Sequence, residues 1–199
     1  MSFQTVRRIS VITLLLLSLT QLTSCGYNSM QEKEEAVYRA WGNVESTLQR
    51  RADLIPNLVA SVKGYASHEK ETLEAVINAR AEATKITLKP GDLSSGQNME
   101  KFQQAQGGLS MALGRLLAVA ENYPNLKANE NFRDLQTQLE GTENRINVAR
   151  KNYNEAVERF NSSIRTFPGS LTNSLLLHLD RKEYFKADAG AMTVPAVKF

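Results

Sequence analysis

Cysteine, histidine and proline are all scarce in this sequence. Its 199 residues include one cysteine, two histidines, five prolines and eleven glycines. A single cysteine excludes an internal disulfide framework and any metal or redox site that needs paired cysteines. Because proline and glycine are few, the sequence has no linker-rich or low-complexity stretches. With 42% hydrophobic residues, the composition is that of one folded domain.

An excess of charge of one sign is also missing. The chain has 24 lysines and arginines against 21 aspartates and glutamates, and Arg7 and Arg8 lie in a leader-like first segment. The rest of the chain has no basic stripe interleaved with aromatic residues, which is the feature expected of a nucleic-acid-binding protein. The sequence therefore predicts no nucleic-acid partner.

The motifs that usually carry catalysis are incomplete or missing. His68 and Glu69 begin like the HExxH zinc motif, but Thr72 occupies the position of the second histidine. The other histidine, His178, has only Asp180 as a nearby acidic residue. The sequence has no glycine-rich phosphate loop, nucleophile elbow or Cys/His pair. These features predict a protein without metal, cofactor or enzymatic activity.

The first 25 residues have the three-part layout of a secretion signal. A pair of arginines precedes an apolar stretch over 9–19, which leads to the sequence Leu-Thr-Ser-Cys at 22–25. That ending resembles the lipobox of bacterial lipoproteins, in which the cysteine sulfur takes a diacylglycerol before the signal is removed. We therefore predict a signal segment at 1–24, a lipid on Cys25 and a tether over 25–30.

The alternative is a single transmembrane anchor formed by the same residues. The apolar stretch is well short of the ~20 residues that cross a bilayer as a helix, so the lipid anchor is favoured. The arginines are expected to stay in the cytoplasm, which places the rest of the chain in the periplasm or outside the cell. By resemblance to lipoprotein sorting rules, Gly26 permits transfer to the outer membrane. We expect a bacterial cell-envelope location.

Apolar residues after the leader recur at intervals of three and four, which predicts long helices. A first helix, over 30–89, carries large apolar residues at 41, 48, 55, 62 and 76, with Glu69 in the same seven-residue register. Pro56 falls inside it. We expect this proline to kink the helix by removing one backbone hydrogen bond at Ala52. The alternative is a new helix capped by Asp53.

Two further long helices and a shorter one are predicted. The second covers 93–122, with caps from Asp92, Ser94 and Ser95 and a stop at Tyr123 and Pro124. The third covers 129–166, and its coiled-coil-like seam consists of Phe132, Leu139, Ile146, Tyr153, Phe160 and Phe167. A shorter helix follows over 171–187, and then an extended tail over 188–199. The predicted fold is all-α, an elongated antiparallel bundle of three to four long helices over 31–187 on a membrane anchor.

Some polar residues are candidates for partner contacts or for pairing inside the bundle. Glu69 occupies an apolar seam position and needs a partner, for which Arg80 or Arg150 would serve. The third helix carries a ladder of asparagines that would bond to a neighbouring helix or to a partner. The candidate residues are Glu69, Arg80, Glu143, Arg150, and the ladder members Asn147, Asn154 and Asn161.

The sequence also resembles the LemA family of bacterial membrane-associated proteins. The resemblance lies in Tyr27, Asn28, Arg51 and the stretch from Asp53 to Leu58, in Tyr65, Ala66, His68, Glu69, Ala79 and Arg80, in Glu121, Tyr123, Pro124, Leu126 and Lys127, and in Glu143, Asn144, Arg145, Ile146, Ala149, Arg150, Tyr153, Asn154, Asn161, Phe167 and Pro168. It implies a long helical bundle on an N-terminal anchor and brings no catalytic residues. In the family's usual picture the anchor is a transmembrane helix and the body is cytoplasmic, from which the lipobox departs.

These observations lead to one expected function and two alternatives. We expect a non-enzymatic envelope lipoprotein, held to the membrane through acylated Cys25, that binds or scaffolds another envelope component, for which a protein is the expected partner. One alternative is a cryptic hydrolase or lipid-handling enzyme, which requires Glu69, Arg80, Glu143 and Arg150 to converge in one pocket. The other alternative is a structural spacer.

Overall fold

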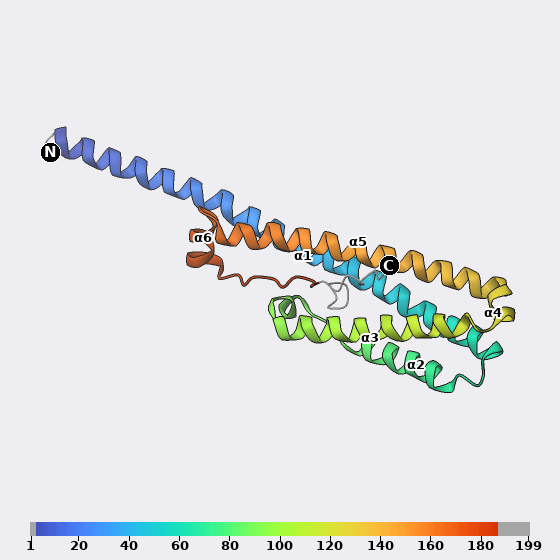
Figure 1. Cartoon of the computed structure of the whole chain (residues 1–199). Coiled ribbons are helices and arrows are strands. Elements are labelled where there is room, and N and C mark those ends of the chain that lie inside the picture. Colours follow the sequence, from blue (N-terminus) through green and yellow to red (C-terminus); the bar gives the residue numbers. More distant parts are fainter. Residues whose placement is uncertain (1–2, 187–199) are drawn as a thin grey trace, which may run out of the picture. The chain divides into compact units, whose positions relative to one another are not determined.

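The computed structural model describes residues 3–186, with side chains from Gly26 onward (Figure 1). Its elements are α1 (Phe3–Tyr65), α2 (Lys70–Lys85), the 3₁₀-helix η1 (Pro90–Ser94), α3 (Gly96–Ala120), α4 (Pro124–Ala128), α5 (Glu130–Arg165), α6 (Gly169–Thr172) and the π-helical turn η2 (Asn173–Leu177). These residues contain no strand, so the predicted all-α class is confirmed. The side chain of Cys25 and the predicted tail over 188–199 lie outside the described residues.

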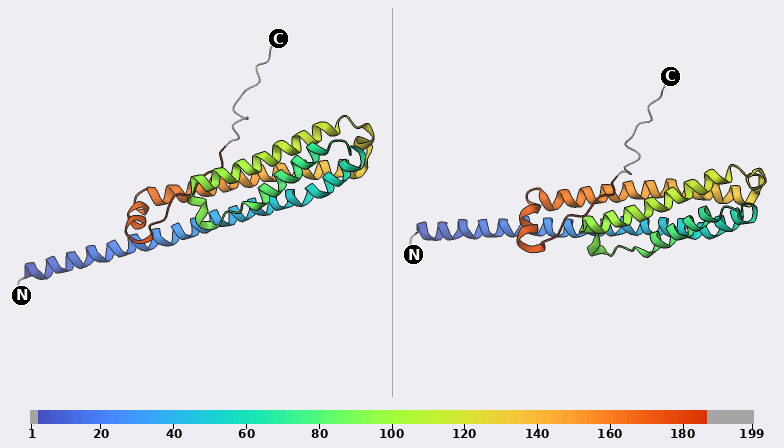
Figure 2. Two further views of the ribbon diagram at one scale, coloured as in Figure 1. Left: turned by 90° about the horizontal axis from the view of Figure 1, so that it is seen from below. Right: turned by 60° about the horizontal axis from the view of Figure 1, so that its bottom comes forward.

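The chain divides into two compact units. Unit 1 comprises Met1–Arg39 with Glu155–Lys182, and unit 2 comprises Ala40–Asn154 with Glu183–Phe199. Within unit 2, the later part of α1, α2, α3 and the earlier part of α5 lie side by side, and each runs opposite to the one before (Figures 1 and 2). Within unit 1, the earlier part of α1 lies beside the end of α5 and beside α6 (Figures 1 and 2).

The core of unit 2 forms where the apolar faces of its helices meet. Helical periodicity brings residues three and four apart onto one face, and burying these faces supplies most of the stability of such helices. The buried residues at the centre of this core are Ile55, Leu58, Val62, Leu73, Val76, Leu109, Leu113, Leu116, Leu126, Phe132 and Leu139. Within the described part of the chain, no helix has an apolar stretch long enough to span a membrane.

Helix α1 continues through Pro56, as the seven-residue spacing predicted. Proline has no N–H, so the carbonyl oxygen of Ala52, one turn earlier, loses its helical donor. The Nε of Arg80, on α2, donates a hydrogen bond to that oxygen at 2.7 Å. Arg80 thereby satisfies a buried backbone acceptor and ties α2 to α1 at the proline.

The first helix is shorter at its C-terminal end than predicted. A single helix over 30–89 is wrong, because α1 ends at Tyr65 and α2 begins at Lys70. Between them the chain turns at Ala66, whose carbonyl accepts the N–H of Glu69 at 3.1 Å. Val62 and Val76 are both fully buried, so the seven-residue spacing persists although two helices supply it. Periodicity does not reveal a turn between two helices whose buried faces are in phase.

The second and third predicted helices are confirmed with small changes at their ends. Helix α3 begins after Ser95, whose side chain accepts the N–H of Asn98, and Pro124 starts the short helix α4. The seam of α5 is buried at every predicted position up to Phe160. Phe167 is the exception, with 83% of its surface exposed. It lies beyond the end of α5 at Arg165, where helical periodicity no longer places side chains.

The predicted helix over 171–187 is wrong. Only α6 and η2 are helical, and His178 takes a left-handed backbone conformation with φ 52°. Residues 178–186 then form neither helix nor strand and run as an extended segment (Figure 1). The side chain of Asn173 replaces helical partners at the start of this segment, because it accepts the N–H of Leu179 at 2.8 Å and donates to its carbonyl at 3.1 Å.

We predict that the hydrogen bond from Arg80 to Ala52 stabilises the folded protein because Pro56 cannot supply a backbone donor to the same carbonyl. Arg80→Met should lower the free energy of unfolding by about 1–2 kcal/mol, since it leaves a buried carbonyl without a donor. In a Pro56→Ala background, the new backbone N–H supplies that donor, so the same Arg80 substitution should cost much less. Urea unfolding of the four chains gives the coupling energy. An equal loss in both backgrounds would show that Arg80 does not compensate for the proline.

Candidate functional site

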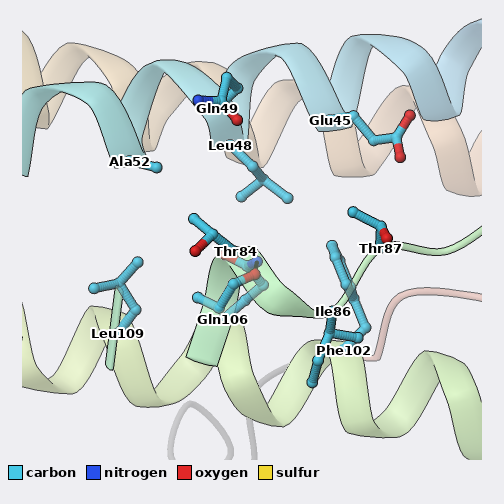
Figure 3. Close-up of a pocket in the computed structure, with 11 residues that line it drawn as sticks. Glu45, Leu48, Gln49, Ala52, Thr84, Ile86, Thr87, Phe102, Gln106 and Leu109 are labelled. Atoms are coloured by element: carbon cyan, nitrogen blue, oxygen red, sulfur yellow. Dashed lines mark hydrogen bonds between the residues drawn. The ribbon is translucent and has the colours of Figure 1, made fainter. Parts of the chain in front are cut away.

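A small pocket opens in unit 2 between α1, the end of α2 and α3 (Figure 3). Its volume is about 100 Å³. Leu48 points from α1 into the space above Thr84 and Gln106, with Glu45 and Thr87 toward one end (Figure 3). The lining residues are Glu45, Leu48, Gln49, Ala52, Ala83, Thr84, Ile86, Thr87, Phe102, Gln106 and Leu109.

The floor of the pocket is apolar and its rim is polar. Leu48, Ala52, Phe102 and Leu109 are buried, whereas the rim residues Glu45, Gln49, Thr84 and Thr87 are exposed. Two of the rim side chains are tied to their own helices. Gln49 donates to Asp53 at 2.7 Å, and the hydroxyl of Thr84 donates to the carbonyl of Arg80 at 2.9 Å. Such a site accepts a small apolar group and offers polar contacts around it.

The pocket is poorly suited to catalysis. Sites for small-molecule substrates are commonly ~300–1,000 Å³, several times larger than this one. The residues around it include carboxylate, amide and hydroxyl groups but no histidine, lysine or cysteine that would activate a nucleophile. Over the described residues, no group of three or more histidine, cysteine, aspartate or glutamate side chains is placed to hold a metal ion.

Behind the pocket wall, Arg51 is fully buried and joins four elements of unit 2. Its Nη1 donates to Ser110 Oγ at 3.0 Å and to Glu143 Oε1 at 2.9 Å, and its Nη2 donates to Gln106 Oε1. The Nε2 of Gln106 donates in turn to the carbonyl of Ala83 at 3.0 Å. Bonds to a charged donor are among the stronger ones in a protein interior. This network therefore sets the spacing of α1, α2, α3 and α5.

A second hollow lies between α3 and α5 on the side of Glu143. It is an open groove of about 480 Å³, and the carboxylate that pairs with Arg51 belongs to its lining. The side chain of Glu143 is 38% exposed, so the ion pair is reachable from solvent on that side. The lining residues are Ser110, Leu113, Gly114, Leu117, Leu139, Glu140, Glu143 and Asn144.

Glu69 has a different partner from the arginines suggested by the sequence. It lies at the start of α2, half-buried, and accepts a hydrogen bond from the hydroxyl of Tyr123 at 2.9 Å. That hydrogen bond, together with burial, raises the pKa of Tyr123. Because Tyr123 lies in the turn between α3 and α4, immediately before Pro124, the contact ties this turn to the start of α2.

The four residues of the suggested enzyme site do not converge. Glu69 and Arg80 lie at positions eleven residues apart along α2, which is about 16 Å of helix rise. Glu143 and Arg150 are seven residues apart on α5, or about 10 Å. Arg80 binds the carbonyl of Ala52 and Glu143 binds Arg51, so these polar groups serve different contacts between helices.

Arg150 belongs to an aromatic cluster in unit 2. Its guanidinium carbon lies 5.3 Å from the ring centre of Phe185, the arrangement of a cation–π contact. Phe185 stacks on Trp41 with ring centres 5.9 Å apart, and Phe102 and Tyr153 pack against the same two rings. The sequence placed Trp41 in the core, and it is 4% exposed.

The asparagine ladder binds backbone rather than another helix. In unit 2, Asn154 donates to the carbonyl of Phe185 at 3.0 Å and accepts its N–H at 2.9 Å. In unit 1, Asn161 makes the same pair of bonds with Lys182, both at 2.9 Å. Asn147 is exposed. The side-chain amides of Asn154 and Asn161 thus each act as a strand-like partner for one residue of the extended C-terminal segment.

Two tyrosines and a buried lysine add to these contacts. Tyr153 donates its hydroxyl proton to the carbonyl of Glu183 at 3.0 Å, and burial, with the Glu183 charge, raises the pKa of Tyr153. In unit 1, the ammonium group of Lys182 lies 2.8 Å from a carboxylate oxygen of Glu34, which also accepts the hydroxyl of Tyr38 at 2.7 Å.

The group formed by Lys182, Glu34 and Tyr38 contributes to the stability of the fold at neutral pH. Burial lowers the pKa of Lys182, but the bonds to Glu34 and Tyr38 outweigh it and the net pKa is raised; burial and the Glu34 bond also raise the pKa of Tyr38. Both groups therefore stay protonated to higher pH when folded than when unfolded. Their contribution to stability is present at neutral pH and is lost as pH rises above about 10 through the raised pKa values.

Among the contact residues that sequence reasoning missed are Arg51, Gln106 and Lys182, and the first two left a signal. Arg51 follows Leu48 by three residues and precedes Ile55 by four, which places it on the buried face of α1. Gln106 likewise precedes Leu109 by three on α3. Lys182 left none, because its burial depends on the extended segment that had been predicted to be helical.

We predict that Asn154→Asp releases the segment around Phe185. A carboxylate cannot donate to the carbonyl of Phe185, and its charge is placed against that oxygen. Hydrogen exchange at the amides of residues 183–186 should become at least about tenfold faster, which corresponds to ~1.4 kcal/mol. Asn147→Asp, seven residues earlier on α5 and exposed, is the matched control. Equal exchange in the two variants would contradict a clamp at Asn154.

Comparison with known proteins places this arrangement in a family. The model of the LemA family matches residues 40–199. Magnetosome protein MamQ 2 of Paramagnetospirillum magneticum is 27% identical over 179 residues, covering 80% of this chain and 64% of the relative. Magnetosome protein MamQ of Magnetospirillum gryphiswaldense is 27% identical over 193 residues, covering 89% and 70%. Protein LemA of Metamycoplasma hominis is 26% identical over 156 residues, covering 77% and 64%.

The match covers most of the chain, although the chain spans only 64% of the length of the first of these relatives. The matched residues contain the whole buried Arg51 network, the pocket and the asparagines that hold the C-terminal segment. The family match over residues 40–199 shows that the chain belongs to the LemA family.

Proposed function

We propose that this chain is a non-enzymatic, membrane-anchored lipoprotein of the bacterial envelope that binds or scaffolds another envelope protein. The observation that carries the proposal is the pocket in unit 2, which combines a buried apolar floor with an exposed polar rim. Pockets of this kind accept single anchoring side chains at the centre of protein interfaces. The partner sits on the face formed by α1, the end of α2 and α3.

The volume of the pocket defines the kind of group that fits. Apolar cavities of ~150 Å³ accept a benzene-sized molecule, so about 100 Å³ suits one branched aliphatic side chain. The carboxylate of Glu45 at the rim favours a basic residue next to that side chain in the partner. We therefore expect a partner that presents an aliphatic residue flanked by lysine or arginine.

Two features support binding over catalysis. The residues Glu69, Arg80, Glu143 and Arg150 make separate contacts between helices, and the pocket residues offer no activated nucleophile. A plain spacer, the third possibility raised by the sequence, has no need of a hollow with a buried apolar floor. The pocket is therefore the feature whose alteration best separates the binding role from the spacer role.

We predict that blocking the pocket abolishes partner binding. A photoreactive phenylalanine at Thr87 should crosslink an envelope protein in intact cells, and Thr84→Trp should remove that product by filling the pocket mouth. Thr137→Trp is the matched control, because Thr137 is also an exposed helical threonine whose hydroxyl donates four residues back, to Arg133 at 3.0 Å. A crosslinked product that survives Thr84→Trp would rule out the pocket as the docking site.

The anchor is tested at Cys25. Mass spectrometry of the chain from native membranes should find an acylated cysteine at the mature N-terminus and no residues from 1–24. Cys25→Ser should keep the leader, since the modifying chemistry requires a thiol. A mature chain that retains residues 1–24 without a lipid would support the transmembrane alternative instead.

A further inference from the structure

Unit 1 exposes a group of large apolar side chains just after α5. Phe167 is 83% exposed, Leu171 49%, Leu175 65% and Leu176 58%. We call these four residues the apolar patch. They lie within ten residues of one another, on and beside α6 and η2. Soluble proteins often expose single apolar residues, whereas several large ones exposed on one short segment indicate an interaction surface.

The turn that carries the apolar patch is fixed from its other side. A Cβ on Gly169 would lie 2.2 Å from the carbonyl oxygen of Ser163, so only glycine allows this approach to the end of α5, and the Cε of Met30 on α1 would lie 2.7 Å away. Thr172 is buried on the same side. Because the inner side of the turn is packed against α1, the leucines on its outer side are held away from the core of unit 1.

The position of the turn along α1 indicates which surface the apolar patch contacts. A Cβ on Gly26 would lie 3.3 Å from Thr172 Oγ1, which places the turn next to Gly26. Gly26 directly follows Cys25, the predicted lipid-bearing residue, and neighbouring Cα atoms are ~3.8 Å apart. Acyl chains on Cys25 would therefore enter the bilayer within a few ångströms of this turn.

We propose that the apolar patch inserts into the interfacial layer of the phospholipid bilayer that holds the acylated Cys25. The inference rests on the proposed lipid anchor, which supplies the direction of the membrane. Apolar side chains on an interfacial segment sink about 5–10 Å into the headgroup and acyl boundary. Exposed Arg165 and Arg181, on either side of the apolar patch in sequence, favour anionic headgroups, although Asp180 offsets part of that charge.

The size of the apolar patch favours lipid over a protein partner. Stable protein interfaces usually take about 20–30 residues from each side, far more than these four side chains. A bilayer needs no matching shape, so a few apolar side chains suffice when a second anchor keeps them at the membrane. The apolar patch and the lipid on Cys25 would then hold unit 1 to the membrane at two adjacent points.

A tryptophan placed in the apolar patch tests the proposal on the full chain. The protein is purified from membranes and reconstituted in vesicles of phosphatidylcholine and phosphatidylglycerol, with or without phospholipids brominated near the top of the acyl chains. Leu175→Trp should give blue-shifted emission that is lost with brominated lipid. The matched control is Met111→Trp, because Met111 has the same 65% exposure but lies in unit 2. The native Trp41, 4% exposed, supplies the background.

The outcomes separate this proposal from that of the lipid anchor. Quenching of Leu175→Trp but not Met111→Trp supports insertion, and Leu176→Trp should repeat it. The proposal of insertion is overturned if brominated lipid does not quench the tryptophan in the apolar patch of a chain whose Cys25 is shown by mass spectrometry to be acylated. That result leaves the lipid anchor intact. Protection of the tryptophan from aqueous iodide without bromine quenching also overturns it, since a protein surface or a second copy then covers the apolar patch. Bromine quenching in a chain without acyl groups retains insertion and rejects the lipid anchor.

Discussion

A buried backbone N–H or carbonyl needs a hydrogen-bond partner, and in this protein side chains supply that partner at three places where a helix does not. Arg80 takes the place of the N–H that Pro56 lacks. Asn154 serves both backbone groups of Phe185, and Asn173 does the same for Leu179. An unpaired group in these positions would cost ~1–3 kcal/mol. Side chains from helical elements therefore hold in place the backbone groups that have no helical partner.

The same requirement explains which side chains perform these roles. An asparagine amide offers one donor and one acceptor, as a peptide group does, so it pairs with an extended residue as a neighbouring strand would. Aspartate has the same shape but offers only acceptors when ionised. Each unit also buries one cation beside a carboxylate, Arg51 with Glu143 in unit 2 and Lys182 with Glu34 in unit 1. Burying a charge costs more than its pairing returns unless further bonds satisfy it, and both cations have them.

Sequence patterns predict this fold where one helix buries one continuous face. Helix α5 was predicted within one residue at each end because its large residues recur every seven positions. The turn at Ala66 was missed because Val62 and Val76 keep the same spacing across it. The residues after Leu177 were misassigned to a helix, because the asparagines that hold them extended, Asn154 and Asn161, lie far away in the sequence on α5. The pocket could not be predicted, since its walls come from three helices whose relative placement no local pattern encodes.

The pocket and the groove in unit 2 are two sides of one hydrogen-bond network. Gln106 lines the pocket, Ser110 and Glu143 line the groove, and Arg51 donates to all three from the layer between them. A group that displaced Gln106 from inside the pocket would act on a guanidinium that also binds two residues of the groove. Through Arg51, the linings of the two hollows share one set of hydrogen bonds, and Glu143 exposes that set to solvent on the groove side.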